Sequence, residues 1–308
     1  MNIYRHSWKI AGLLITTCTL CLPSFAQETQ PLEVSGSVEL GLEYNNNLNI
    51  PELESASGRS DIAAVIGGDI GLDWTPEENW NVDTGYSYSG SRYKDIGSYD
   101  IDLHMLNADI SRDIGELSLG GNVYYADASL GGDGFLSLKQ YSLYAGQLFA
   151  GKYYLRGALN RNEKSFETLD SRDADNQGFS LDGFWFFNEG QTSLMLGFTA
   201  ADEDAQANQF DYDSRGWRVR FSHRFLFAGV NSRLQLGYRR EQRDYSSITP
   251  AIDTFRDDTR TKLEAQWNLS FTENIDLIGK IERGDYRSNL ESADYNENRV
   301  TLSAAYKF

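Results

Sequence analysis

Charged residues spaced two and four positions apart are the ones in this sequence whose chemistry could act on a solute. The late part of the chain carries basic residues in this pattern, namely Arg218, Arg220, Arg224, Arg239, Arg243, Arg260 and Lys262. The early part carries acidic ones, namely Glu39, Glu43, Asp69, Asp73, Asp83 and Asp102. Residues two apart in an extended chain share one face, so each set predicts a charged wall. Opposed charged walls orient polar solutes and filter ions.

Catalytic candidates are few. Beyond residue 26 the histidines are His104 and His223. His223 alternates with apolar residues and is predicted on the apolar face, whereas His104 can share the polar face with Asp102 and Asn107 if the strand slips near Met105. A lone His beside an acid is more often a hydrogen-bonded wall residue than a general base, and no serine stands in a recognisable relation to it. The acidic loops match no calcium-binding spacing. We therefore expect no enzyme, no metal and no cofactor.

Apolar and polar residues alternate along almost the whole chain, and this pattern must position the charged residues. Val38, Leu40 and Leu42, for example, alternate with Glu39 and Glu43. A period of two is typical of strands, and about fourteen such segments can be counted. They begin near Leu32, Ile62, Trp80, Asp100, Leu117, Leu136, Tyr153, Gln177, Thr192, Gly216, Arg233, Thr259, Ile275 and Tyr295.

The connections and the aromatic residues decide between two all-β architectures. A soluble sandwich of two stacked sheets would also alternate. Here short turns (75–79, 113–115, 188–190, 272–274) alternate with long acidic loops (45–60, 163–176, 202–213, 245–258). Aromatic residues recur near strand ends: Tyr44, Trp74, Trp80, Trp185, Phe187, Phe225, Trp267, Phe271, Tyr306 and Phe308. Together these features predict an antiparallel transmembrane β-barrel of about 14 strands.

The first 26 residues predict a secretory signal peptide, with a basic start, an apolar stretch at 10–22 and a cleavage site at Ser24-Phe25-Ala26. Residues 27–308 then form the barrel. Cleavage removes both cysteines, and it takes two of the 28 basic residues but none of the 45 acidic ones, so the net charge falls from −17 to −19. Such acidity argues against a nucleic-acid partner. No apolar run reaches the ~18 residues that a spanning helix needs.

Several short motifs carry a family resemblance. They are Tyr44-Asn45-Asn46-Asn47-Leu48-Asn49, Phe255-Arg256-Asp257-Asp258-Thr259-Arg260, Ser288-Asn289 and Tyr295-Asn296-Glu297-Asn298. With the terminal Phe308, they resemble the barrel of the surface lipoprotein assembly modifier family, and they are similar to porins encoded with exopolysaccharide export systems. The alternating last strand also resembles the C-terminal signature of outer-membrane barrels. That likeness implies that Tyr306 and Phe308 form the signal read by the barrel assembly machinery.

We therefore expect a protein of the bacterial outer membrane, in contact with lipid and lipopolysaccharide. The leading hypothesis is a porin-like transport or export conduit for a polar or anionic solute or polymer, with polysaccharide as one candidate cargo. The alternative is a closed barrel, its lumen filled by salt bridges, that serves as a surface binding or lipoprotein-assembly factor through its long acidic loops. Fourteen strands fall between the small filled barrels and the wide open channels, so both hypotheses remain open at this point.

Overall fold

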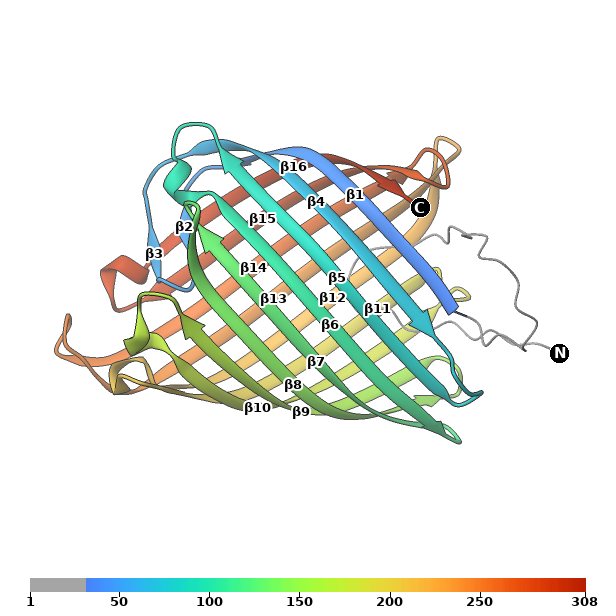
Figure 1. Cartoon of the computed structure of the whole chain (residues 1–308), viewed down its shortest axis with the longest axis horizontal. Coiled ribbons are helices and arrows are strands. Elements are labelled where there is room, and N and C mark those ends of the chain that lie inside the picture. The colour runs from blue at the N-terminus through green and yellow to red at the C-terminus, as the bar shows by residue number, and fades with distance from the viewer. Residues whose placement is uncertain (1–31) are drawn as a thin grey trace.

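In the computed structural model, which describes residues 32–308, fourteen long strands form one closed antiparallel barrel (Figure 1). They are β1 (Leu32–Asn45), β4 (Asp61–Trp74), β5 (Trp80–Tyr93), β6 (Ile101–Ile114), β7 (Leu117–Leu130), β8 (Asp133–Phe149), β9 (Tyr153–Phe166), β10 (Ala174–Phe187), β11 (Thr192–Ala205), β12 (Tyr212–Phe227), β13 (Val230–Thr249), β14 (Thr254–Ser270), β15 (Ile275–Ser288) and β16 (Tyr295–Lys307). The predicted fold class and strand number are confirmed. The predicted signal peptide lies outside the described residues.

Ring closure joins the two ends of the described chain. Each strand pairs with its neighbour along the chain, and β1 pairs with β16 from Ser37↔Lys307 to Asn45↔Arg299. Gly36 extends this seam, because its backbone N–H and C=O both bond to Phe308 at 3.0 Å. A closed ring leaves no unpaired strand edge, which is the condition for strands to stand in lipid.

The outer face of the ring is apolar and accessible. Leu40, Leu143 and Leu159 are 63%, 71% and 68% exposed. In a water-soluble protein so large an apolar surface would be buried or covered, whereas lipid covers it at no cost. Aromatic rings gather on it near strand ends, as in the stacked pair of Tyr153 and Trp185 with centroids 5.9 Å apart. This is the arrangement of an aromatic girdle.

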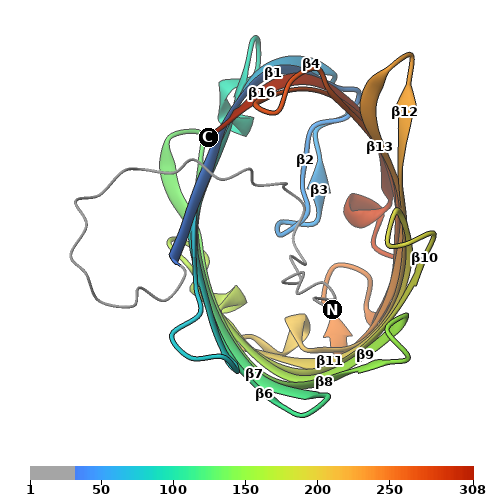
Figure 2. The same ribbon diagram turned by 90° about the vertical axis from the view of Figure 1, so that its right-hand side faces the viewer.

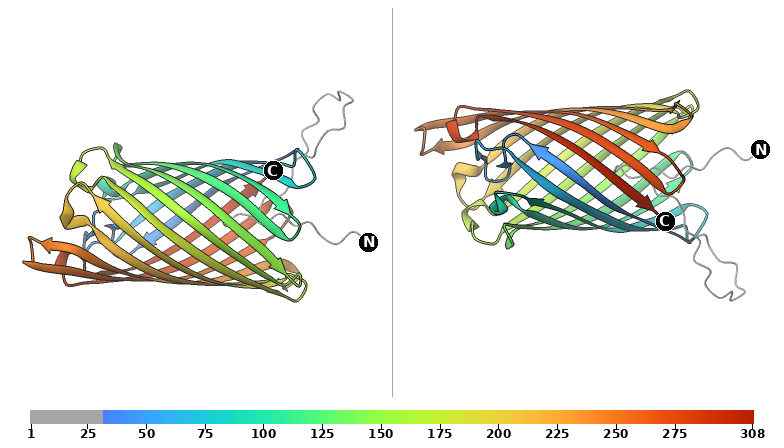
Figure 3. Two further views of the ribbon diagram at one scale, coloured as in Figure 1. Left: turned by 90° about the horizontal axis from the view of Figure 1, so that it is seen from below. Right: turned by 90° about the horizontal axis from the view of Figure 1, so that it is seen from above.

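Helical structure in the described part consists of the single turns η1 (Gly97–Tyr99), η2 (Asp170–Arg172), η3 (Asn208–Phe210) and η4 (Glu291–Ala293). No helix within residues 32–308 is long and apolar enough to cross a membrane. Each single turn lies in a connection at the same end of the barrel, which we call the loop end. The opposite end, with Phe308, is called the turn end (Figure 3).

Three of the predicted long loops are shorter than expected. Segments 163–176, 202–213 and 245–258 shrink to 167–173, 206–211 and 250–253, because the flanking strands continue to pair. Glu163, Asp202 and Asp213 thus stand in strands rather than in loops. Crossing a bilayer takes only ~9–11 residues of a strand, so strands of 13 to 20 residues extend beyond it as a polar wall. The β13–β14 hairpin reaches furthest (orange in Figure 3).

The fourth predicted loop, between β1 and β4, folds into the barrel. It contains the small strands β2 (Asn49–Ile50) and β3 (Ser55–Ala56), which lie inside the ring (Figure 2). We call residues 46–60 the inward hairpin. Its base is fixed by Leu48, which is 1% exposed, and by Asn49, whose amide donates to Glu297 at 2.6 Å. The hairpin therefore has an anchored stem, and its tip projects across the lumen.

Candidate functional site

The predicted basic residues lie on the lumen side of three adjacent strands. Trp217, 60% exposed, marks the outer face of β12, and the alternate positions point inward. The inward positions carry Arg218, Arg220 and Arg224 on β12, Arg239 and Arg243 on β13, and Arg260 and Lys262 on β14. Arg218, Arg239 and Lys262 are direct cross-strand partners and form one row across the wall. The structure thus gathers this set into a continuous basic wall.

The row of cations is compensated by acids within hydrogen-bonding distance. The pairs are Arg218 with Asp182 (2.7 Å), Arg239 with Glu241 (2.8 Å) and Lys262 with Glu282 (2.6 Å). Two of these pairs join different strands, β12 to β10 and β14 to β15, whereas Arg239 and Glu241 both lie on β13.

Closer to the turn end, no acid of the described residues lies within ion-pair distance of the basic wall. Asp276, the acid whose charge acts on Arg233, forms its ion pair with Lys307 instead. Arg224 and Arg233 are direct cross-strand partners on the lumen side. Among the described residues, no carboxylate forms an ion pair with Arg220, Arg224 or Arg233. The guanidinium of Arg224 donates to the carbonyl of Gly190 at 3.4 Å, and the buried Nε of Arg233 has no hydrogen-bond partner in the described part. Like charges directly opposite each other on paired strands are destabilising. The pair of Arg224 and Arg233 therefore lowers the stability of the barrel and creates a positive potential in this part of the lumen.

Five of the six predicted acids line the lumen on β1, β4 and β5, namely Glu39, Glu43, Asp69, Asp73 and Asp83. Asp73 and Asp83 are direct cross-strand partners. Hydroxyls donate to two of the others, from Ser303 to Glu39 and from Ser37 to Asp69, both at 2.5 Å. A hydroxyl stabilises a carboxylate without cancelling its charge, so Glu39 and Asp69 keep their negative charge, whereas Glu43 forms an ion pair with Arg299 at 3.6 Å.

The sequence suggested that the acidic and basic walls face each other across the lumen, but they are not diametrically opposed. In the ring order, β15 and β16 separate them on one side, and the six strands β6–β11 separate them on the other. The transverse field therefore crosses one sector of the lumen rather than its full width.

Asp102 does not line the lumen, and that prediction is wrong. β6 pairs with β5 and β7 without a break, so there is no slip of register near Met105. Asp102 shares the outer face with Leu106, which is 53% exposed, and its carboxylate pairs with Arg92 at 2.6 Å. His104 follows on that face, with Nδ1 2.8 Å from the hydroxyl of Tyr86. The strongest catalytic candidate from the sequence therefore also faces away from the lumen.

The tip of the inward hairpin carries Glu54, whose carboxylate is bound by side chains from three other segments. Oε2 accepts from Nη1 of Arg256 at 2.6 Å and from Nη1 of Arg172 at 3.4 Å. Oε1 accepts from the hydroxyl of Tyr245 at 2.7 Å and from Nη2 of Arg260 at 3.1 Å. Arg256 is 2% exposed and Glu54 is 8% exposed. We call Arg172, Tyr245, Arg256, Asp258 and Arg260 the Glu54 cage.

The side chain of Glu54 is negatively charged in the folded protein. Burial by itself raises the pKa of Glu54, but the hydrogen bond and positive charge of Arg256, assisted by Tyr245 and Arg260, outweigh it and lower the pKa to about 2. Glu54 is thus ionised at every physiological pH. Asp258 holds the other side of Arg256, with oxygen 2.6 Å from Nη2.

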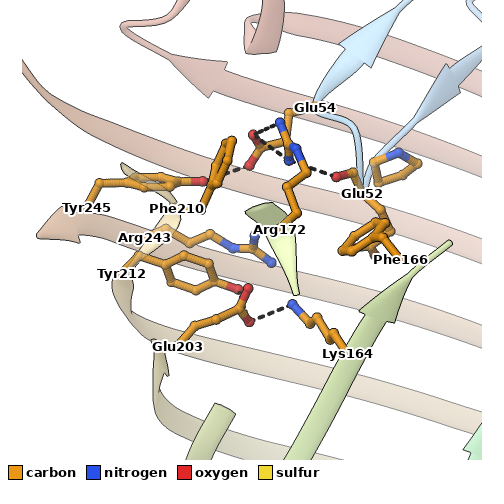
Figure 4. Close-up of a pocket in the computed structure, with 11 residues that line it drawn as sticks. Glu52, Glu54, Lys164, Phe166, Arg172, Glu203, Phe210, Tyr212, Arg243 and Tyr245 are labelled. Carbon is orange, nitrogen blue, oxygen red and sulfur yellow. Dashed lines mark hydrogen bonds and ion pairs between the residues drawn. The ribbon is translucent and has the colours of Figure 1, made fainter. Parts of the chain in front are cut away.

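A second cluster lies beside the cage (Figure 4). Glu203 binds Lys164 at 2.5 Å and accepts from the hydroxyl of Tyr212 at 2.8 Å. The guanidinium of Arg243 lies 4.4 Å from the ring centroid of Tyr212. Arg172 is held from the side by Phe210, whose ring centroid lies 4.2 Å from Cζ. These contacts tie the hairpin tip, η2 and the barrel wall into one constriction at the loop end.

Sequence reasoning missed the centre of this site. The alternation that places Arg260 inward does the same for Arg256, so this arginine could have been found. Tyr245 shares the inward face of Arg243 in the same way. Nothing local predicts that Glu54 would reach them, because a loop has no periodicity. Among the described residues, no group of three or more His, Cys, Asp and Glu side chains could hold a metal ion.

No family model matches the chain, and no curated protein matches it in sequence. Among solved structures, the fold is similar to OmpT in its trimer form, an outer membrane protein of Vibrio cholerae, with a TM-score of 0.53 and 11% identity over 91% of this chain and 100% of that one. It is also similar to an anion-selective porin from Comamonas acidovorans, with a TM-score of 0.51 and 10% identity over 91% and 100% of the two chains. These likenesses establish the fold of an outer-membrane β-barrel.

Proposed function

We propose that this barrel is a porin-like conduit of the bacterial outer membrane that carries an anionic solute or polymer. The observation that carries the proposal is the run of uncompensated lumen arginines, Arg220, Arg224 and Arg233, below the constriction at the loop end. A positive field inside a water-filled passage with low-dielectric walls concentrates anions. The apolar outer face and the closed ring support a place in lipid.

The chemistry of the lumen also bears on the class of cargo. Hydroxyls and carboxylates line the early strands, while guanidinium groups, some of them paired with acids, line the late ones. Such a surface offers hydrogen bonds to a sugar and charge to its acidic groups. An acidic polysaccharide is therefore the cargo we favour, in keeping with the resemblance of the Phe255–Arg260 and Tyr295–Asn298 segments to porins encoded with exopolysaccharide export systems.

Electrical recording tests this function. The full barrel, folded into planar bilayers under a KCl gradient, should form channels whose reversal potential indicates preference for chloride over potassium. Absence of any channel, even when a short Gly-Ser linker replaces residues 46–60, would sink the proposal.

The runner-up is a closed barrel that acts as a surface binding or lipoprotein-assembly factor. The cross-linked constriction at the loop end favours it, because a rigid mouth presents a defined surface. Under this alternative, deleting residues 167–173 and 206–211 would abolish the binding or assembly activity at the cell surface. The presence or absence of channels would not affect that activity. Because these two connections are shorter than the sequence suggested, they offer a smaller binding surface for such a factor.

A further inference from the structure

The donors around Glu54 form a complete binding site for one carboxylate. Each carboxylate oxygen has two donors: Tyr245 and Arg260 serve Oε1, while Arg256 and Arg172 serve Oε2. These donors come from β13, β14 and η2, and none comes from the hairpin itself. Guanidinium groups match the planar shape of a carboxylate. The barrel wall and η2 thus recognise a chemical group, and the hairpin merely supplies it.

The cage retains a positive charge when Glu54 is taken away. Three arginines remain, Arg172, Arg256 and Arg260, with Asp258 as the acid that pairs with the last two at 2.6 and 3.6 Å. The neighbouring acid Glu241 is already bound by Arg239 and Arg243. Buried cations without a partner are strongly unfavourable. An emptied cage would therefore take up another anion.

The hairpin is built so that its tip can leave while its stem stays. Glu54 ends the turn between β2 and β3 with φ of 55°, the left-handed conformation that Asp253 also adopts in the β13–β14 turn. The contacts of the tip with the cage are those of the Glu54 carboxylate and the backbone oxygen of Glu52, which accepts from Arg172 at 3.1 Å. The stem is fixed independently by Leu48 and by the bond from Asn49 to Glu297. Release of the Glu54 carboxylate would therefore leave the anchor of the hairpin intact.

We propose that the Glu54 cage is a binding site for a carboxylate of the cargo, and that the inward hairpin occupies it as an internal ligand until a carboxylate-bearing polysaccharide displaces Glu54. This inference rests on the conduit function proposed above and specifies its substrate as a uronate-type polymer. Further toward the turn end, beyond the compensated row of Arg218, Arg239 and Lys262, the arginines Arg220, Arg224 and Arg233 would contact later carboxylates of the same chain.

Tethering explains why a polymer is required. A ligand attached through a short linker competes at an effective concentration in the millimolar range. A single free carboxylate such as acetate would displace Glu54 poorly. A polymer presents several carboxylates together, so a neighbouring unit rebinds when one dissociates.

Calorimetric titration of the folded full chain in detergent with trigalacturonate tests the proposal. Glu54→Gln removes the negative charge that occupies the cage while keeping the side-chain size, and it should bind trigalacturonate at least tenfold more tightly than the wild type. Glu52→Gln is the matched control, since it removes an exposed carboxylate from the same hairpin and should bind like the wild type. Adding Arg256→Gln to Glu54→Gln should abolish the gain, and neutral maltotriose should bind no variant.

Equal affinity of Glu54→Gln and the wild type for trigalacturonate would overturn the inference. If Glu54→Gln does not fold, replacing residues 51–54 with a Gly-Ser linker removes the same carboxylate and must give the same gain. Parallel bilayer recordings separate the two proposals. Channels without any gain in binding reject the carboxylate site alone, whereas a gain in binding without channels in any variant rejects the conduit and leaves the carboxylate site standing.

Discussion

The carboxylate of Glu54 lies 2.6 Å from Nη1 of Arg256, although 202 residues separate them in the chain. The two residues meet because the first loop-end connection folds inward and β14 presents Arg256 on its lumen face. This ion pair joins the loop that narrows the barrel to the wall that carries its positive charge. The opening of the mouth and the recognition of anions are therefore expected to depend on the same contact.

Removing Arg256 should free the hairpin. Arg256→Met leaves Glu54 and Asp258 buried without their main partner, and breaking a buried pair in this way costs about 3 kcal/mol or more. Hydrogen exchange of residues 46–60 should become markedly faster, while the barrel strands keep their protection. Arg161→Gln is the control, because Arg161 forms only exposed pairs on the outer wall. Unchanged exchange in Arg256→Met would contradict the assigned contact.

Acid should release the hairpin over a defined range of pH. The pKa of Glu54 is lowered from 4.5 to about 2 in the folded protein, so its contribution to hairpin stability is fully present above pH 4.5. The contribution declines as the pH falls from 4.5 through about 2, and it amounts to about 3 kcal/mol for this shift. The protection factors of residues 46–60, which correct for the slower intrinsic exchange in acid, should therefore fall over this range. In Glu54→Gln this part of the pH dependence should disappear; if it persists, another group is responsible.

The uncompensated arginines should set ion selectivity. Neutralising Arg220, Arg224 and Arg233 together with glutamine should shift the reversal potential toward potassium by removing three lumen charges. Arg215→Gln serves as control, because Arg215 has the same parity as Trp217 and faces outward. Selectivity that does not differ between the triple variant and the control would remove the main support for an anion conduit.

The closing seam should tolerate no side chain at Gly36. A Cβ there would lie 2.7 Å from Cζ of Phe308 and 2.8 Å from the backbone oxygen of Asp69. Gly36→Ala should therefore reduce the fraction of chains that close, which the heat-dependent mobility of the barrel in electrophoresis measures. Gly279→Ala is the matched control on β15, where nothing lies within 4 Å of the added atom. Equal folding yields for the two variants would show that the seam adapts.

The sequence by itself determined the barrel, because alternation is a local property. Each strand separates a lipid face from a lumen face through its own residues, and the turn-end boundaries follow where the alternation stops. Alternation also placed Arg218 and Glu39 on the lumen side without knowledge of their neighbours. It failed at Asp102 and His104 for a physical reason. Toward the loop end the strands extend beyond lipid, both faces are polar, and polarity no longer distinguishes inside from outside.

Only the tertiary structure decided how the lumen is occupied. Ring closure sets which strands neighbour one another, and it placed the acidic and basic walls in sectors separated by β15 and β16 rather than opposite each other. The tip of the inward hairpin is held by the buried carboxylate of Glu54, whose partners come from η2, β13 and β14. Such a contact gains its strength from burial among distant segments, so no local pattern encodes it.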